Sequence, residues 1–219
     1  MAERISNFLD QEDEYQAAIN SAIRYLNSGE VIVVAAESAY VYLCDAFNHR
    51  AVKNIHTLRG DSIATVAQVF VKELSVLTGI AAAITANQSK ILKNFWPGLL
   101  SVTLPAHPGL SWDLGDEQRL GKINVRIPNR KFLSEILLKS GPLATASIAF
   151  SGRGAITDLS QIIIHEADIG AIFDEGILKP GSLSTVVEFS ENDVTIKREG
   201  AITKSQLAPY LASIPETNL

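Results

Sequence analysis

Residues 31–40 read Val-Ile-Val-Val-Ala-Ala-Glu-Ser-Ala-Tyr, an unbroken apolar run that ends in a polar turn. A run of this length that is rich in valine is typical of a central strand covered on both faces. Open α/β sheets usually present ligand-binding groups where such a strand ends. The stretch therefore predicts an α/β fold with a candidate site in the turn, where Ser38 either donates to a ligand or satisfies the local backbone.

The segments on either side alternate between helical and strand patterns. Apolar residues at helical spacing precede Gly29, which ends the first helical pattern. We predict helices over residues 13–28, 50–58, 80–94, 131–139, 159–166 and 204–211. We predict strands over residues 31–36, 65–71, 100–104, 123–127, 143–147, 169–173, 185–189 and 194–198. Because the last strands follow one another with short connections, the expected architecture is a twisted mixed sheet flanked by helices.

Composition and charge limit the class of protein. The 219 residues are 47% hydrophobic and 20% charged, as in ordinary globular proteins, and no repeat or linker-like tract interrupts them. We therefore predict one domain over residues 1–219. The net charge of −5, with dispersed Lys and Arg, argues against long-range capture of nucleic acid. No membrane association is expected, because the apolar runs are shorter than the roughly 20 residues that span a bilayer.

The N-terminal segment and the single cysteine bear on the compartment. Residues 1–15 are polar and acidic, unlike a secretory signal, and Cys44 cannot form an internal disulfide. A reducing cytoplasm is therefore the expected location. Cys44 lies in an apolar stretch, which favours a buried inert thiol over a nucleophile. The four histidines show no metal-ligand spacing and are predicted at the surface.

Arg126 lies in the predicted strand over residues 123–127, between a valine and an isoleucine. A buried guanidinium without a partner is costly, so Arg126 needs an anion. The anion is either an internal Asp or Glu, which this segment alone favours, or a ligand carboxylate held by the guanidinium fork.

Three further segments combine turn residues with side chains able to bind a ligand. Residues 95–98 (FWPG) most simply anchor a loop in the core, with ligand stacking as the alternative. Residues 141–152 (GPLATASIAFSG) suit either a phosphate-binding loop or a plain tight turn. Arg198, before Gly200, binds a phosphate or pairs with a surface acid. The P-loop, G-x-G-x-x-G and G-x-S-x-G motifs are absent from the sequence.

Taken in order, these segments resemble the YrdC/TsaC family of threonylcarbamoyl-AMP synthases over residues 15–203. Residues 35–40 (AAESAY) are similar to the family's P-T-E-T-x-Y turn, and Ser38 keeps the hydroxyl. The other matching segments are F-W-P-G at 95–98, V-R-x-P at 125–128, G-P-L-A-x-P-S-x-N-x-S-G at 141–152, S-T-V-V at 184–187 and R-x-G-A-I at 198–202. The ordered series carries the resemblance more than any single motif.

The resemblance implies a YrdC-like fold and a reaction. L-Threonine and bicarbonate or CO2 would form a carbamate that attacks the α-phosphorus of ATP and releases pyrophosphate. A downstream tRNA-modifying threonylcarbamoyl transferase would use the product, threonylcarbamoyl-AMP. Such chemistry requires positioning and charge neutralisation more than a covalent nucleophile, which agrees with the missing nucleophile motifs.

The resemblance also assigns residues by their position in the matching segments. Three residues would bind the amino acid: Ser38, Arg126 and Thr145. Three residues matched to the family's motifs would bind ATP: Arg59, Ser147 and Arg198. Mg²⁺ would accompany the phosphates of ATP.

The match is weakest around the phosphates. The family's K-G-R appears here as R-G-D at residues 59–61, so Asp61 replaces the second cation, and Ala149 replaces the Asn of S-x-N. A charge reversal about 4 Å from a phosphate changes the interaction by several kcal/mol at an effective dielectric constant near 20. Lys122 is predicted as a further ATP-binding residue that returns positive charge, and Arg153 is a second candidate. Asp61 is alternatively a ligand of Mg²⁺.

Two other functions remain open alongside the synthase. One is a catalytically silent YrdC-like protein that binds a nucleotide or a small carboxylate. The other is direct RNA binding through a concave cleft, which the dispersed Lys and Arg residues favour least.

Overall fold

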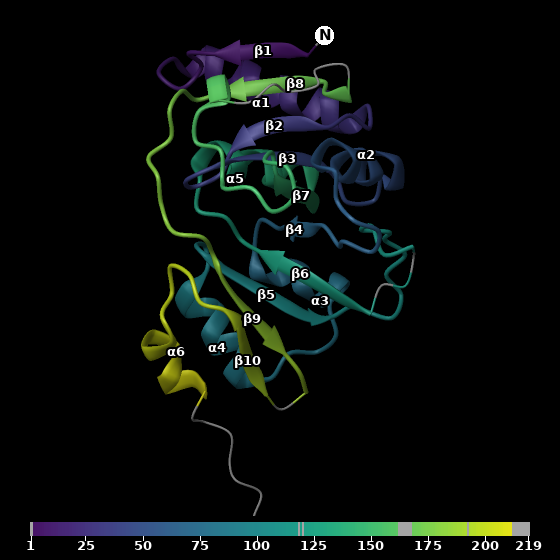
Figure 1. The fold of residues 1–219 in the computed structure, drawn as a ribbon, viewed down its shortest axis with the longest axis vertical. Helices are drawn as coiled ribbons and strands as arrows, with labels where there is room; N and C mark the ends of the chain where they lie inside the picture. Colours follow the sequence, from purple (N-terminus) through teal and green to yellow (C-terminus); the bar gives the residue numbers. More distant parts are fainter. Residues whose placement is uncertain (1, 118, 120, 162–167, 192, 212–219) are drawn as a thin grey trace, which may run out of the picture.

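A single mixed sheet runs through the protein from one end to the other (Figure 1). The computed structural model describes residues 2–117, 119, 121–161, 168–191 and 193–211. Within them the strand order is β1-β8-β2-β3-β7-β4-β6-β5-β9-β10. The strands are β1 (Glu3–Ser6), β2 (Ile32–Ala35), β3 (Tyr40–Asp45), β4 (Gln68–Phe70), β5 (Leu100–Pro105), β6 (Lys122–Arg126), β7 (Leu143–Ser147), β8 (Ala171–Asp174), β9 (Thr185–Phe189) and β10 (Val194–Arg198).

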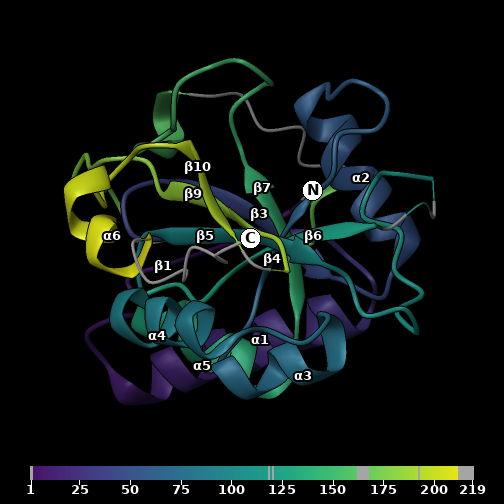
Figure 2. The same cartoon turned by 90° about the horizontal axis from the view of Figure 1, so that it is seen from below.

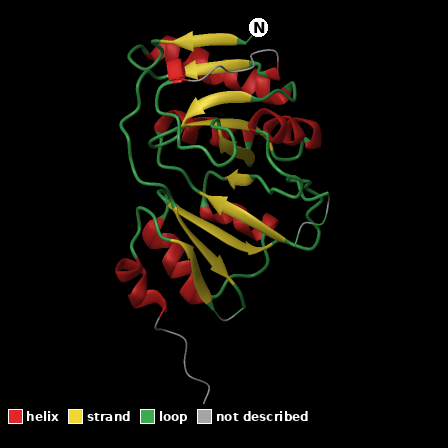
Figure 3. Ribbon diagram, viewed as in Figure 1, coloured by secondary structure: helices red, strands yellow, loops and turns green. Residues whose placement is uncertain are grey.

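Parallel and antiparallel pairs alternate irregularly along this sheet. The pairs β1/β8, β2/β8, β4/β6 and β5/β9 are parallel, whereas β2/β3, β3/β7, β4/β7, β5/β6 and β9/β10 are antiparallel. The strand direction turns progressively from β1 to β10 (Figure 3), as the right-handed twist of strands requires. The prediction of a twisted mixed sheet in an α/β fold is confirmed.

Helices cover the two faces of the sheet. They are α1 (Glu12–Asn27), α2 (His49–Arg59), α3 (Leu77–Ile80), α4 (Ala86–Phe95), α5 (Lys131–Ser140) and α6 (Lys204–Leu211), with single 3₁₀ turns η1 (Leu74–Val76) and η2 (Leu159–Gln161). Figure 2 shows α1, α3, α4 and α5 together on one side, away from α2. Among the described helices, none has the length and apolar character that a membrane crossing requires.

Strand β2 is buried on both faces, as predicted. Ile32 and Val34 pack into the cluster that contains residues of α1 and α5. Val33 and Ala35 alternate with them and belong to the cluster that contains residues of α2. Because successive side chains of a strand point to opposite faces, this alternation places β2 between two helical layers.

The helix predicted over residues 80–94 is wrong in its first part. Helix α3 ends at Ile80, and Ala81 instead forms an isolated bridge with Ala106. Helix α4 then begins after Thr85, whose side chain accepts from the Gln88 backbone N–H while the Gln88 side chain accepts from the Thr85 N–H. This capping box satisfies two free donors at a new helix start and so divides the apolar pattern.

Two strands were not predicted, and one predicted helix is largely outside the described residues. Strand β1 is short and polar, and β3 follows the 37–39 turn at once to form a hairpin with β2, Ala35 pairing with Tyr40. The predicted helix over 159–166 begins as η2, and its residues 162–166 lie outside the description. The strand predicted over 65–71 is confined to Gln68–Phe70, because a turn occupies residues 62–65.

Thr185 joins β9 to the turn that follows β10. Its buried hydroxyl donates to the Ile202 carbonyl (2.6 Å) and accepts from the backbone N–H groups of Gly200 (3.0 Å) and Ile202 (2.9 Å). Thr185→Val keeps the shape but leaves three backbone groups without this partner. We expect a loss of about 3 kcal/mol in the free energy of unfolding, measured by chemical denaturation.

Thr195 provides the matched control for this substitution. It lies on the neighbouring strand β10, but its side chain is exposed. Thr195→Val should change the free energy of unfolding by less than about 0.5 kcal/mol. Equal effects of the two substitutions would contradict the role assigned to the buried hydroxyl.

Candidate functional site

A cavity of about 580 Å³ lies over the middle strands of the sheet. Side chains of β4, β6 and β7 line it, together with the 37–39 turn, the end of α2 and the segment before β9. Its charged side chains, apart from a histidine, are four arginines (Arg59, Arg126, Arg153 and Arg198) and two carboxylates (Glu37 and Asp61). A protein of net charge −5 therefore carries a locally cationic cleft, which suits an anionic ligand.

Arg126 is the buried cation of this cleft. Its side chain is 8% exposed, one Nη donates to Glu37, and the guanidinium lies 4.9 Å from the centre of the Phe70 ring. Burial lowers the pKa of Arg126, and the Glu37 carboxylate partly offsets this effect. The internal acid that the sequence favoured is therefore present. However, the Nε of Arg126 is buried without a hydrogen-bond partner among the described residues.

Thr145 presents a second buried polar atom without a partner. It lies on β7, opposite Leu43 of β3 and Gln68 of β4, and is 2% exposed. Its Oγ1 has no hydrogen-bond partner among the described residues. Buried polar atoms are almost always paired in native proteins, so two such atoms lining one cavity indicate a place where a ligand supplies the missing partners.

A chain of hydrogen bonds runs along the floor of the cavity. The Gln68 side-chain amide donates to Ser101 Oγ (2.8 Å), which donates to Ser184 Oγ (2.9 Å). Arg198 in turn donates to the Ser184 carbonyl (2.8 Å) and hydroxyl (3.2 Å). Gln68 also donates to Asn124. These contacts fix Arg198 of β10 relative to β4 and β5.

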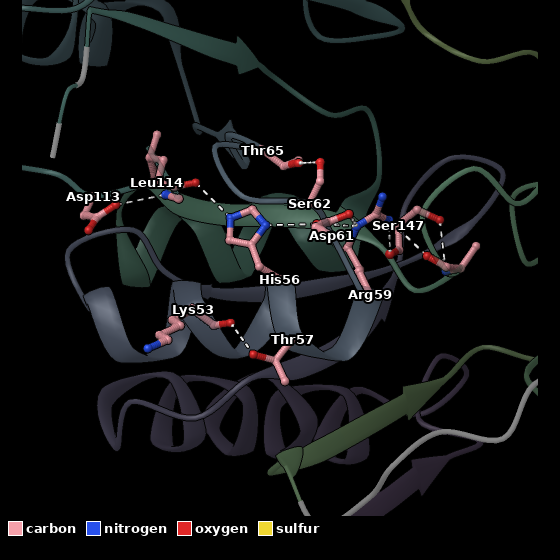
Figure 4. A network of polar contacts seen from close by, with 12 residues as sticks. Lys53, His56, Thr57, Arg59, Asp61, Ser62, Thr65, Asp113, Leu114 and Ser147 are labelled. Carbon is pink, nitrogen blue, oxygen red and sulfur yellow. Dashed lines mark hydrogen bonds and ion pairs between the residues drawn. The ribbon is translucent and has the colours of Figure 1, made fainter. Parts of the chain in front are cut away.

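A second network lies at the end of α2 (Figure 4). Asp61, whose side chain is 1% exposed, accepts from Arg59 Nε (3.1 and 3.0 Å) and contacts His56 Nδ1 (2.9 Å). Burial alone would raise the pKa of Asp61, but the hydrogen bonds from His56 and Arg59 outweigh it and hold the pKa below its usual value. The acid is thus neutralised within the protein and is not left as a bare negative charge in the cleft.

Arg59 also contacts the loop that follows β7. Its Nη1 donates to the carbonyls of Ser147 (2.6 Å) and Ala149 (3.1 Å), and its own carbonyl accepts from the Ser151 N–H (3.0 Å). The segment predicted as a phosphate loop is therefore fixed to the C-terminal end of α2. Gly60, in the left-handed region at φ +61°, ends the helix at this point.

The sequence of this chain matches a known protein family over most of its length. The family model for Sua5/YciO/YrdC, described as "Telomere recombination", matches residues 24–200. The chain belongs to the Sua5/YciO/YrdC family. The resemblance stated from the sequence motifs is thereby confirmed.

Individual relatives of this family extend the comparison. A Mycobacterium leprae protein named provisionally as a threonylcarbamoyl-AMP synthase is 28% identical over 97% of both chains. The threonylcarbamoyl-AMP synthase of Bacillus subtilis is 27% identical over 94% of this chain and 61% of its own length. The crystal structure of P. abyssi Sua5 complexed with L-threonine matches 98% of this chain and 62% of that chain, with a TM-score of 0.81 and 21% identity. The chain thus spans about three fifths of the last two proteins.

Of the seven predicted site residues, the six that the family motifs assign line the cavity. They are Ser38, Arg59, Arg126, Thr145, Ser147 and Arg198. Lys122 is the exception, because it lies at the far end of β6 and its Nζ pairs with Glu188 (2.5 Å), with the lysine side chain 58% exposed. The structure does not bring Lys122 to the cleft, whereas Arg153 does line it.

The structure also tests the predictions made for Trp96, the single cysteine and the histidines. Trp96 of F-W-P-G is buried and its Nε1 donates to the Leu100 carbonyl (2.7 Å), which supports the core anchor over ligand stacking. Cys44 is a buried free thiol, and burial raises the pKa of this thiol above its usual value. His49 and His107 are exposed as predicted, and His165 lies outside the described residues. His56 departs from the prediction, since its side chain is only 14% exposed.

No cluster of carboxylate, histidine and cysteine side chains among the described residues has the form of a metal site. Both carboxylates of the cleft, Glu37 and Asp61, are paired with arginines. The interpretation of Asp61 as a Mg²⁺ ligand therefore does not fit the side chains that surround it.

Sequence reasoning missed several residues of the cleft, mainly Glu37, His56, Gln68, Ser101 and Asn124. A signal for one of them was present next to a family segment, the V-R-x-P at residues 125–128. Asn124 lies two residues before Arg126 on β6, and positions i and i+2 of a strand face the same side. The contacts of Glu37 with Arg126 and of His56 with Leu114 join distant parts of the chain, so no local pattern predicts these partners.

Proposed function

We propose that this protein is an L-threonylcarbamoyladenylate synthase, which forms threonylcarbamoyl-AMP and pyrophosphate from L-threonine, bicarbonate or CO2, and ATP. The observation that carries the proposal is a pair of buried atoms in the cationic cleft, Arg126 Nε and Thr145 Oγ1, that have no hydrogen-bond partner among the described residues. A zwitterionic hydroxy amino acid supplies a carboxylate for the first and polar groups for the second. The names of the relatives and the threonine bound by P. abyssi Sua5 support the same substrate.

The amino-acid end of the cleft is formed by Arg126, Thr145 and Ser38. Arg126 binds the carboxylate, since a guanidinium fork matches its two oxygens. Ser38 lines the pocket from the 37–39 turn, against the passing segment at Gly181. A Cβ at Gly181 would lie 2.9 Å from Ser38 Cβ. The close approach of these two segments leaves room in the pocket for a small amino-acid side chain.

The nucleotide end is formed by the loop after β7 and by the arginines. Arg59, Ser147 and Arg198 were predicted for ATP, and all three line the cavity together with Arg153. Mg²⁺ enters this proposal only as part of the ATP substrate, because Mg²⁺ commonly keeps its waters and binds through substrate phosphates. The nucleotide charge is then neutralised by three arginines of the cleft, Arg59, Arg153 and Arg198.

The chemistry of the proposed reaction needs no protein nucleophile. The threonine amine and CO2 form a carbamate, whose oxygen attacks the α-phosphorus of ATP with pyrophosphate as the leaving group. The cleft positions the two substrates and neutralises their charges, which makes the protein a nucleotidyltransferase. The product would pass to a tRNA-modifying threonylcarbamoyl transferase. Direct RNA binding by this chain stays the least favoured alternative.

The test is incubation of the protein with ATP, L-threonine, bicarbonate and Mg²⁺, followed by measurement of pyrophosphate and of the acyl-adenylate. Pyrophosphate should appear only when threonine and bicarbonate are both present. Omission of each substrate in turn provides the controls. Pyrophosphate release that does not depend on threonine would contradict the proposal.

The binding protein without catalysis has one observation in its favour. Asp61 neutralises Arg59, and the Nη1 of Arg59 is already used by two carbonyls. Part of the positive charge on the nucleotide side is therefore committed within the protein. Calorimetric binding of threonine or ATP with no product in the same assay would assign this second function instead.

A further inference from the structure

Asp61 occupies a position where the sequence alone suggests repulsion of a phosphate. Its carboxylate is 1% exposed and both of its oxygens accept from Arg59 Nε. His56 contacts one of these oxygens from the opposite side. The acid therefore faces two basic side chains of the protein, and its environment differs from that of an unpaired charge in the cleft.

His56 lies between two hydrogen-bond acceptors. Its Nδ1 faces the Asp61 carboxylate at 2.9 Å, and its Nε2 faces the Leu114 carbonyl at 2.9 Å (Figure 4). His56 and Arg59 thus contact the same carboxylate. The Arg59 guanidinium makes Asp61 the centre of a charge-assisted network.

The backbone around His56 is shaped to admit its ring. Gly115 has φ +107°, and a Cβ there would lie 2.4 Å from His56 Nε2 and 2.3 Å from the Thr65 carbonyl. A side chain at this position would displace the ring from the Leu114 carbonyl. The glycine thus permits a contact between α2 and a loop 58 residues further along the chain.

The third member, Arg59, transmits this arrangement to the loop after β7. Its Nε is held by Asp61, and the same planar guanidinium directs Nη1 at the carbonyls of Ser147 and Ala149. The Ser151 N–H donates to the Arg59 carbonyl. Because the guanidinium is rigid and planar, fixing its Nε edge also fixes the direction of Nη1.

We propose that Asp61 and His56 are positioning residues, which hold Arg59 so that the 147–151 loop presents a fixed backbone to the nucleotide phosphates. The inference rests on the proposed function for the identity of the ligand, while the loop geometry does not depend on it. It also gives Asp61 the opposite effect from the one its charge suggests. Removing the acid should weaken nucleotide binding, although the removal makes the cleft more positive.

The first experiment measures backbone hydrogen exchange of the ligand-free protein in peptides that cover residues 147–151. Asp61→Asn, which keeps the side-chain shape, should accelerate exchange there at least about tenfold. Glu188→Gln is the control, since Glu188 pairs with Lys122 and Lys197 outside the cleft. Unchanged exchange in Asp61→Asn would overturn the proposal.

The second experiment measures binding of Mg²⁺-ATP and of L-threonine separately by calorimetry. Asp61→Asn and His56→Gln should raise the Kd for ATP about tenfold and change the Kd for threonine less than twofold. Asp61→Arg is the sharpest variant, because added positive charge should strengthen ATP binding if charge alone mattered. Stronger or unchanged ATP binding in that variant, or an equal loss for both ligands, would overturn the proposal.

A double-substitution cycle shows whether Asp61 acts through Arg59. In an Arg59→Ala background, Asp61→Asn should have no further effect on ATP affinity or on loop exchange. Independent effects of the two substitutions would overturn the proposal. If the unaltered protein binds neither ATP nor threonine, the proposed function fails, and the exchange measurements alone decide the positioning role.

Discussion

Arg126→Ala is expected to weaken L-threonine binding by at least about a hundredfold. Truncating one partner of a buried, charge-assisted contact costs about 3 kcal/mol or more of binding free energy, and each 1.4 kcal/mol is a factor of ten. The Arg126 side chain is 8% exposed, and within the described part of the chain its buried Nε has no hydrogen-bond partner. Calorimetric titration of threonine into the variant measures the effect.

Arg130→Ala is the matched control for this substitution. Arg130 is also a partly buried arginine paired with a glutamate, since its Nε and Nη2 donate to Glu175. It does not line the described cleft. We expect Arg130→Ala to lower the free energy of unfolding and to leave threonine affinity within about twofold. Threonine affinity retained within tenfold in Arg126→Ala would contradict the role of Arg126.

The fold was predictable where one local pattern had one physical outcome. The valine-rich run after residue 30 gave β2, because an unbroken β-branched run requires cover on both faces. Strands β7, β9 and β10 and helix α6 have the predicted boundaries. The prediction of one helix over 80–94 was wrong because the apolar spacing continues past Thr85, whereas the capping box at Thr85 starts a new helix.

The motifs predicted which residues line the site, but they did not predict the side chains that pair with those residues. Arg126 required an anion on energetic grounds, but the identity of Glu37 depends on the 37–39 turn folding back across 89 residues. The prediction that Lys122 reaches the cleft was wrong, because residues a few positions apart in an extended strand lie far apart in space. Four residues along β6 separate Lys122 from Arg126 by about 13 Å, and there the lysine Nζ pairs with Glu188 of β9.

Asp61 is a further residue whose surroundings the motif did not predict. Read from the motif alone, an acid in place of a cation implies lost phosphate binding. The structure surrounds the acid with Arg59 and His56, and the His56 contact depends on a loop at Leu114. The effect of a charge depends on its neighbours. Arg59 and His56 lie within five residues of Asp61, but the Leu114 carbonyl that His56 contacts comes from a segment 58 residues further along the chain.

Phe132→Ala is expected to lower the free energy of unfolding by about 3 to 5 kcal/mol. Phe132 lies at the start of α5, is 2% exposed, and its ring contacts those of Phe8 (4.7 Å between centroids), Phe173 (5.3 Å) and Tyr15 (5.7 Å). Truncation removes the ring common to these contacts and leaves a cavity between α1, α5 and the sheet. Chemical denaturation measures the loss, which is a large part of the 5 to 15 kcal/mol typical of a folded domain.

Leu138→Ala on the same helix separates this packing effect from helix propensity. Leu138 is 68% exposed, so its truncation should cost less than about 0.5 kcal/mol. If Phe132→Ala does not accumulate as folded protein, Phe132→Leu should fold with an intermediate loss, since it keeps most of the apolar volume. Threonine affinity of the folded Phe132 variants should match that of the unaltered protein, because Phe132 does not line the described cleft. A loss of stability as small as that of Leu138→Ala would show that the aromatic cluster does not hold α5 against the sheet.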